Sequence, residues 1–312
     1  MAHLRSFRFG VQLTHPLGDR SWADTARHLE SLGYDALHLP DHFGDQLAPM
    51  PAMMAAAAAT TSLKVGALVL DNDYKHPVVT AKELATIDVL SGGRVEVGLG
   101  AGWMTSDYEQ SGIPLDPPGV RVSRMEEGIA VLKGLFSDDP VDFSGDHYQL
   151  SGLEGTPTPV QRPHPPFLIG GGGKRVLSIA AQEADIVGIN PSMKAGVIGP
   201  EAAADATAEA TDRKVGWVRE VAGDRWERIE LNMLVMAAIP TDDRPGTAAM
   251  MGDLFGVDAD AALEVPHLWI GSDDEICADL ERRRDRWGVS YYVLQGDACE
   301  AMAPVVQRLT GT

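Results

Sequence analysis

The sequence predicts an α/β fold of the (β/α)8 barrel class, and three observations support this. Strand-like runs alternate with amphipathic helices, about eight such units fit into the chain, and three of the runs end in residues that can do chemistry. These ends read Leu-Pro-Asp-His at 39–42, Leu-Gly-Ala-Gly-Trp at 99–103 and Ile-Gly-Gly-Gly-Gly-Lys at 169–174. Because the strands of a barrel all end at one mouth, we expect these segments to form one catalytic face.

Composition predicts one globular domain over residues 1–312. The sequence is 44% hydrophobic and 23% charged, which is typical of a chain with a large core, and no Pro/Gly/Ser-rich linker divides it. The net charge of −19 argues against a nucleic-acid partner, because phosphates need clustered Lys and Arg. We expect this acidity mainly to serve solubility.

The termini and the cysteines predict a cytoplasmic protein with no membrane partner. The longest apolar stretch, 51–59, is too short to span a bilayer, and residues 1–13 lack the apolar core of a signal peptide. Cys277 and Cys299 both fall in stretches with a helical pattern, so a disulfide is not expected.

The elements of the first half have clear local signals. A helix that opens at Ser21 should close at Gly33, and Pro77 should occupy the first turn of another. Residues 104–119 are rich in proline and predict a long loop of the kind that covers active sites. The predicted strands are 7–13, 35–40, 63–70 and 94–99, and the predicted helices are 21–32, 50–62, 77–90 and 122–136.

The second half predicts a hairpin, four strands and the helices between them. The arginine-rich stretch 281–286 belongs to one of these helices, and we expect it to be a solvated face rather than a phosphate site. The hairpin is predicted at 141–150, the strands at 167–169, 186–189, 230–239 and 290–295, and the last helix at about 298–309.

The glycine run at 170–173 predicts an anion site. It follows a strand and precedes a helix, so backbone N–H groups can approach a phosphate at the positive end of that helix, helped by Lys174 and Arg175. The run is not a P-loop, because Arg175 stands where Ser or Thr must follow the lysine. The alternative is that the glycines only permit a tight turn.

The segment 98–103 resembles a dinucleotide fingerprint, but Trp103 replaces its final glycine and it follows the fourth strand rather than the first. We therefore favour a flat cofactor lying against the backbone at Gly100 and Gly102, with Trp103 as a wall of the substrate pocket. Simple core packing of Trp103 is the alternative.

His42, beside Asp41, is the candidate catalytic residue, because it follows the end of the second strand. A structural hydrogen-bonding role is the alternative. His38 on the same strand is interpreted as barrel packing. The sequence has no His-Glu-x-x-His motif and no cysteine cluster, so a metal is not expected.

Together, the segments 32–42, 76–77, 90–103 and 169–173 resemble the bacterial luciferase-like family, and its coenzyme F420-dependent oxidoreductase branch matches best. The resemblance extends from about residue 8 to 293. It implies a barrel that binds F420 or FMN at the mouth, with a non-prolyl cis peptide near Ala67-Leu68. The residues that it implies at the cofactor are Asp41, His42, Ala67, Leu68, Ala101, Gly102, Ser106, Gly171, Gly172 and Lys174.

The resemblance implies hydride transfer between the deazaflavin and a small organic substrate. Sugar-phosphate dehydrogenases of the branch carry a carboxylate where this chain has Trp103, which argues against their substrate. An FMN-dependent monooxygenase and a catalytically idle cofactor-binding protein are the alternatives. A homodimer and a separate cofactor-reducing enzyme are the partners that we expect.

Overall fold

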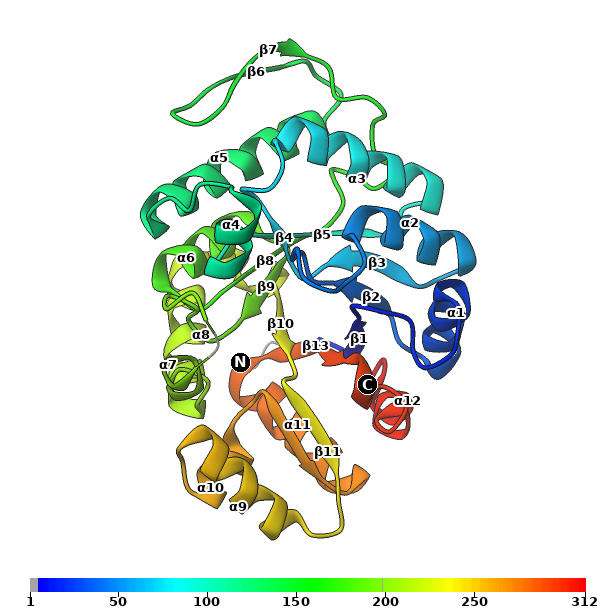
Figure 1. Cartoon of the computed structure of the whole chain (residues 1–312), viewed down its shortest axis with the longest axis vertical. Coiled ribbons are helices and arrows are strands. Elements are labelled where there is room, and N and C mark those ends of the chain that lie inside the picture. The colour runs from blue at the N-terminus through cyan, green and yellow to red at the C-terminus, as the bar shows by residue number, and fades with distance from the viewer. Residues whose placement is uncertain (1–4, 198) are drawn as a thin grey trace.

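The computed structural model describes residues 5–197 and 199–312, and its centre is a closed parallel barrel (Figure 1). Each barrel strand pairs in parallel with the next, and the last pairs with both β10 and β1, which closes the ring. The barrel strands are β1 (Arg8–Gln12), β2 (Ala36–Leu39), β3 (Lys64–Ala67), β5 (Val95–Gly100), β8 (Phe167–Gly171), β9 (Ile186–Ile189), β10 (Glu230–Leu234) and β13 (Val289–Gln295). The predicted (β/α)8 barrel is confirmed.

Helices surround this barrel (Figure 1). The larger ones are α1 (Trp22–Leu32), α2 (Pro49–Ala59), α3 (Pro77–Ser91), α5 (Pro118–Leu135), α6 (Lys174–Glu183), α8 (Ala208–Ala222) and α11 (Asp273–Trp287). Shorter ones are α4 (Thr105–Ser111), α7 (Pro200–Ala204), α9 (Arg244–Phe255), α10 (Ala259–Glu264), α12 (Ala303–Leu309) and the 3-10 turns η1 (Gly223–Arg228) and η2 (Gly296–Ala298).

Side chains alternate between two cores, as the period of two along a strand requires. On β13, Tyr292 and Leu294 pack in the large core between barrel and helices, whereas Tyr291 and Val293 pack in a small cluster inside the barrel. On β2, Leu37 and Leu39 face outward in the same way. The barrel interior therefore has room for polar side chains between small hydrophobic layers.

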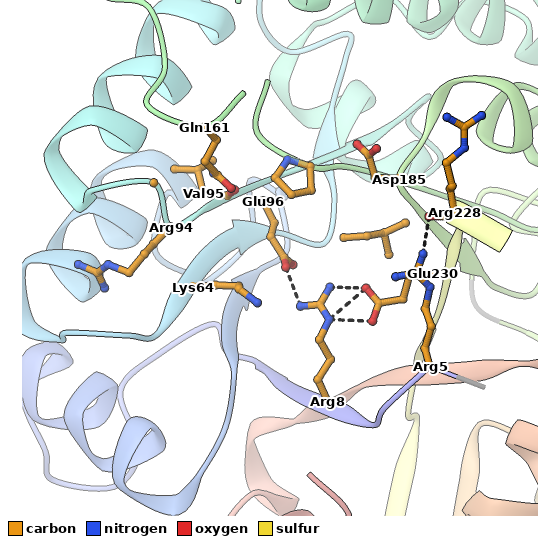
Figure 2. A pocket seen from close by; sticks show the side chains of 13 residues that line it. Arg5, Arg8, Lys64, Arg94, Val95, Glu96, Gln161, Asp185, Arg228 and Glu230 are labelled. Carbon is orange, nitrogen blue, oxygen red and sulfur yellow. Dashed lines mark hydrogen bonds and ion pairs between the residues drawn. The ribbon is translucent and has the colours of Figure 1, made fainter. Parts of the chain in front are cut away.

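The amino-terminal end of the barrel is closed by one arginine. Arg8 donates to both carboxylate oxygens of Glu230 and to one oxygen of Glu96 (Figure 2). It also donates to Asp35, and its guanidinium lies 3.5 Å from the centre of the Tyr291 ring. Burial raises the pKa of Glu96, but Arg8, His38 and Lys64 together lower it by more, so the pKa lies well below its usual range. The start of β1 is thus tied to β5, β10 and β13.

His38 belongs to this interior network, which confirms its interpretation as barrel packing. It is completely buried, and its Nε2 lies 2.5 Å from the Tyr291 hydroxyl. The Tyr291 hydroxyl in turn donates to Glu96 at 3.1 Å.

The local signals at helix ends are confirmed. Ser21 accepts a hydrogen bond from the Asp24 amide at the start of α1, and Gly33 ends that helix with φ of 93°, a conformation that favours glycine. Pro77 occupies the first turn of α3 as predicted.

Several predicted boundaries are wrong. The predicted strand 230–239 is two strands, because the chain leaves the barrel after β10 and forms β11 (Ala237–Pro240), which pairs with β12 (Leu268–Gly271) in a separate sheet. The last helix is shorter than predicted and begins at Ala303. The hairpin exists as β6 (Val141–Ser144) and β7 (Gln149–Leu153).

Two other differences lie near the mouth. The predicted loop 104–119 contains the short helix α4, and α5 begins at Pro118, since a proline suits a first turn. The predicted strand 63–70 is β3 followed by β4 (Leu70–Asp71). Between them lies a cis peptide at Leu68-Val69, one bond after the expected position.

Three further predictions concern individual side chains and helices. Cys277 and Cys299 are both free and buried. Most of the arginine-rich stretch is solvated, but Arg283 is buried and donates to backbone carbonyls such as that of Leu268. None of the helices in the described ranges combines the length and the apolar character that crossing a membrane requires.

Candidate active site at the carboxyl end of the barrel

The candidate residues lie at the carboxyl ends of four neighbouring strands. Asp41 and His42 follow β2, Leu68 follows β3, Ala101 to Trp103 follow β5, and Gly171 to Lys174 connect β8 to α6. Since β2, β3, β5 and β8 are adjacent in the ring and parallel, their ends share one side of the mouth.

His42 is held by a carboxylate on the helix that covers the mouth. Its Nδ1 lies 2.6 Å from Oδ2 of Asp107, a buried residue of α4, and the Tyr74 hydroxyl donates to the same oxygen at 3.0 Å. A carboxylate only accepts, so Nδ1 carries the proton that joins the pair. Nε2 then remains available, and the side chain is 23% exposed.

Trp103 forms a wall beside His42. The two ring centres are 5.6 Å apart, and the rings are nearly perpendicular. Trp103 is only partly buried, so the alternative of simple core packing does not describe it fully. Nearby, Phe43 packs against Tyr74 with ring centres 4.5 Å apart, although Phe43 is half exposed.

A second carboxylate cluster lies behind Gly102. The Tyr108 hydroxyl donates to Asp71 at 2.9 Å and to Asp73 at 3.2 Å, and Asp41 accepts the Asp71 amide at 3.0 Å. Burial, followed by the nearby carboxylates of Asp73 and Asp41, raises the pKa of Asp71 to about 7. Burial likewise raises the pKa of Asp41.

Gly102 is required by this packing. Its φ of 71° favours glycine, and a Cβ there would overlap the Tyr108 hydroxyl and lie 2.5 Å from an oxygen of Asp71. The backbone at Gly102 therefore lies directly against the acidic cluster.

The floor of the mouth is small and apolar. Val69 is partly exposed above the buried Leu68, whose carbonyl accepts a hydrogen bond from Gln12 at 2.7 Å. A Cβ at Gly100 would lie 2.6 Å from Val69, and a Cβ at Gly170 would lie 3.7 Å from it. Glycine backbone therefore lies beside the Val69 side chain at this end of the barrel.

The glycine run has two different roles. A Cβ at Gly172 would overlap the backbone of Pro191 and Ser192, and that loop is fixed because Asp205 accepts the Ser192 amide at 2.8 Å. The buried Lys214 also donates to the Asn190 carbonyl at 2.9 Å. A side chain at Gly172 would therefore displace this loop, so Gly172 is needed for packing.

Gly173 faces open space instead. Apart from its two chain neighbours, no atom of the described residues lies within 4 Å of a Cβ built there, and Gly173 caps α6 without a side-chain hydrogen bond. The first turn of α6 contains no acidic residue, so its amides and its dipole remain available to an anion.

The two basic residues after the run differ. Arg175 donates to the Gly119 carbonyl and to Ser123, both on α5, so it is not free for an anion. Lys174 is exposed and has no side-chain partner in the described part of the chain. Of the two residues, only Lys174 remains a candidate for the anion binding that the sequence suggests for Lys174 and Arg175.

The remaining predicted residues occupy different surroundings. Ala101 is partly exposed at the mouth, and Ser106 is exposed on α4. Ala67 is buried in the core between barrel and helices. No group of three or more His, Cys, Asp or Glu in residues 5–197 and 199–312 could hold a metal ion.

Sequence reasoning missed Asp107, Tyr74, Asp71 and the loop at 190–192. Asp107 lies within the segment 104–119, which had been singled out as functional, but nothing local connects it to a histidine 65 residues earlier. A buried carboxylate in a helix that follows a barrel strand is the one signal that could have pointed to it.

Comparison with known proteins gives one family. The model of the family described as luciferase-like monooxygenase matches residues 2–222. The chain is 37% identical over 131 residues to an FMNH(2)-dependent dimethylsulfone monooxygenase of Pseudomonas putida, covering 42% of this chain and 36% of that protein. It is 31% identical over 163 residues to an F420-dependent glucose-6-phosphate dehydrogenase of Amycolatopsis mediterranei, covering 50% of this chain and 49% of that protein.

The matches thus span half or less of the length of these two curated relatives. Among solved structures, the coenzyme F420-dependent tetrahydromethanopterin reductase from Methanopyrus kandleri superimposes with a TM-score of 0.74 and 18% identity, over 98% of this chain and 99% of that chain. At this identity the likeness demonstrates the shared fold.

Proposed function

Because the chain belongs to the luciferase-like monooxygenase family, we propose that it is an oxidoreductase that transfers a hydride between coenzyme F420 and a small organic substrate. The observation that carries the proposal is the pair of His42 and Asp107, which leaves the Nε2 of a fixed imidazole open at the mouth. The relative from Amycolatopsis mediterranei, named as F420-dependent, supports the choice of cofactor.

The residues at the mouth fit such a cofactor. A planar ring fits on the floor formed by Val69 and the glycine backbone at Gly100 and Gly170. Ala101, Gly102 and the side chains of Asp41 and His42 would border that ring. The amino terminus of α6 and Lys174 would hold the anionic tail, with Gly171 and Ser106 nearby.

Bound F420 supplies the hydride chemistry, and the protein supplies position and protons. When a hydride adds to one atom of a double bond, the other atom needs a proton. His42 can deliver that proton from Nε2 while Nδ1 stays hydrogen-bonded to Asp107, and in the reverse direction Nε2 can accept it. Trp103 and Phe43 would hold the substrate over the ring.

A reduced-FMN monooxygenase is the second candidate, and the relative from Pseudomonas putida favours it. The same mouth would hold the flavin. A separate enzyme would then supply reduced cofactor, and either activity is compatible with a homodimer.

Titration of the protein with F420 and with FMN, followed by absorbance and tryptophan fluorescence, tests the proposal. We expect F420 to bind at least about tenfold more tightly, a difference of about 1.4 kcal/mol. We also expect oxidation of reduced F420 by members of a panel of carbonyl, imine and activated-alkene compounds. Equal or tighter FMN binding with oxygen uptake would favour the monooxygenase, and binding without turnover would favour an idle cofactor-binding protein.

A further inference from the structure

A second side chain reaches the carboxylate that holds His42. Tyr74, in the loop between β4 and α3, donates its hydroxyl to Oδ2 of Asp107 at 3.0 Å, and His42 Nδ1 lies 2.6 Å from the same oxygen. The other oxygen of Asp107 accepts the Phe43 amide at 3.5 Å. One carboxylate oxygen therefore accepts from two side chains, and only one of them is the candidate catalytic residue.

Asp107 has little contact with water that could replace either donor. Its side chain is 7% exposed, and it reaches from α4 to the loop after β2. In such surroundings the charge of a carboxylate is balanced mainly by the groups that it binds, because a low dielectric strengthens each of these contacts. The charge of Asp107 is therefore shared between the imidazole and the Tyr74 hydroxyl.

Tyr74 acts on this carboxylate as a hydrogen-bond donor. Burial, followed by the negative charge of Asp71 and the hydrogen bond to Asp107, raises the pKa of its hydroxyl far above the usual range. A hydroxyl that does not ionise near neutral pH is a poor source of protons for a substrate. Its contact with Asp107 is therefore its main means of acting on the site.

The Tyr74 ring is fixed by its neighbours, which keeps the hydroxyl in place. Its centre lies 4.5 Å from that of Phe43 and 5.6 Å from that of Tyr108. The Tyr74 amide donates to the Asp71 carbonyl at 3.2 Å. Tyr74→Phe removes the hydroxyl and retains the ring that makes these contacts, so the variant isolates one hydrogen bond.

Other titratable groups lie near the imidazole and its two partners. They come from the loop after β2, the loop between β4 and α3, and α4, and they are Asp41, Asp71, Lys75 and Tyr108. Among the residues that the structure describes, however, only His42 and Tyr74 contact Asp107 with side-chain donors. The other groups are the same in Tyr74→Phe and in the parent, so a comparison of the two reports on the hydroxyl.

We propose that Tyr74 is a positioning residue that acts through Asp107 and sets how strongly His42 holds its proton. By balancing part of the carboxylate charge, the hydroxyl weakens the attraction of Asp107 for the imidazolium, so Nε2 releases its proton more readily. For its effect on the rate, this inference rests on the proposed function, in which His42 gives that proton to a substrate.

Nitrogen-15 NMR of the full chain without cofactor, recorded across a pH series, tests this inference, and the spectrum of His42→Ala identifies the His42 signals. In Tyr74→Phe we expect the midpoint of the His42 titration to move upward by about 0.5 to 1 pH unit, because the charge of Asp107 then favours the protonated ring more strongly. Tyr34→Phe is the matched control, since its buried hydroxyl donates to a neutral acceptor, the Cys299 carbonyl, at 2.8 Å. We expect no shift in the control.

The same comparison in an Asp107→Asn background shows whether the effect passes through the carboxylate. Asp107→Asn removes the negative charge, so adding Tyr74→Phe should then move the midpoint by at most about 0.2 pH unit. An equal shift in both backgrounds, no shift in Tyr74→Phe alone, or the same shift in Tyr34→Phe would overturn the inference.

Enzyme kinetics distinguish a failure of this inference from a failure of the proposed function. If His42 gives the proton, the pH profile of kcat/KM in Tyr74→Phe should move in the same direction and by the same amount as the NMR midpoint. A moved NMR midpoint with an unmoved pH profile would support the action of Tyr74 on His42 and overturn only the role of His42 as proton donor.

Discussion

The two ends of this barrel both contain buried charged residues, but they use them differently. At the amino-terminal end, Arg8 satisfies Glu96, Glu230 and Asp35 with its own hydrogen bonds. At the carboxyl end, Asp107 accepts hydrogen bonds from His42 and Tyr74, and the imidazole Nε2 has no partner among the residues that the structure describes. A network in which every charged group is hydrogen-bonded stabilises a fold. A network that leaves a donor or acceptor atom unused at an opening can bind or protonate a ligand.

Substitution of His42 should have the largest effect. His42→Ala should lower kcat by about 10²- to 10⁴-fold, the usual contribution of a general acid or base, while cofactor affinity changes much less. Steady-state kinetics and cofactor titration measure the two effects.

Near-parental kcat in this variant would reduce His42 to a structural residue. Loss of cofactor binding alone would make it a contact of the ring.

At the other end, removal of Arg8 should act on stability and not on chemistry. Arg8→Met leaves Glu96, whose side chain is 3% exposed, without its cation, so we expect a loss of about 3–5 kcal/mol in the free energy of unfolding. Urea denaturation measures this loss. The kcat of the folded fraction should stay near that of the parent.

Arg27→Gln breaks an exposed pair and is the control, with an expected loss of at most about 1 kcal/mol. A loss for Arg8→Met as small as that of the control would show that the network at the base does not hold the barrel together.

Two adjacent glycines separate packing from ligand access at the mouth. Gly172→Ala should destabilise the protein by about 1–3 kcal/mol, because the new methyl group overlaps the backbone of Pro191 and Ser192. Gly173→Ala should change stability by less than about 0.5 kcal/mol, since a Cβ there meets no atom of the described residues beyond its chain neighbours. Similar thermal stability of the two variants would contradict this assignment.

The acidic cluster at the mouth should make stability depend on pH. The pKa of Asp71 is about 7 in the folded protein and 3.8 ordinarily, so the folded state binds the extra proton and stability falls as pH rises from about 4 to 7. Relative to Asp71→Asn, the parent should lose about 1 kcal/mol per pH unit in this window. Urea unfolding at pH 4.5, 5.5 and 6.5 measures the slope, and a flat difference would contradict the shift.

The fold was predictable because its signals are local. Gly33 and Pro77 mark helix ends by their own backbone preferences, and the nearly continuous apolar run at 63–70 is typical of a parallel strand buried on both faces. The division of 230–239 was not predictable, since β11 leaves the barrel to pair with β12, a segment nearly 30 residues later. The alternation of apolar and polar residues along a strand does not indicate with which other strand it pairs.

Of the candidate site, only the residues that directly follow predicted strands were predictable. His42, Trp103 and the glycine run could be predicted as site residues because each directly follows a predicted strand. Asp107 is brought to His42 by the parallel pairing of β2, β3 and β5 and by α4, and the overlap at Gly172 depends on a loop near residue 191. Such contacts between distant segments have no signature in the sequence.

The most direct test of the account is the F420 affinity of two variants, one at each end of the barrel. Lys174→Gln should weaken F420 binding about three- to tenfold, because it removes the free cation beside the amino terminus of α6. Arg228→Gln removes an equally exposed cation at the base and should leave the affinity within about twofold of the parent. Weaker binding in Arg228→Gln with parental binding in Lys174→Gln would contradict the assignment of the cofactor to the carboxyl end.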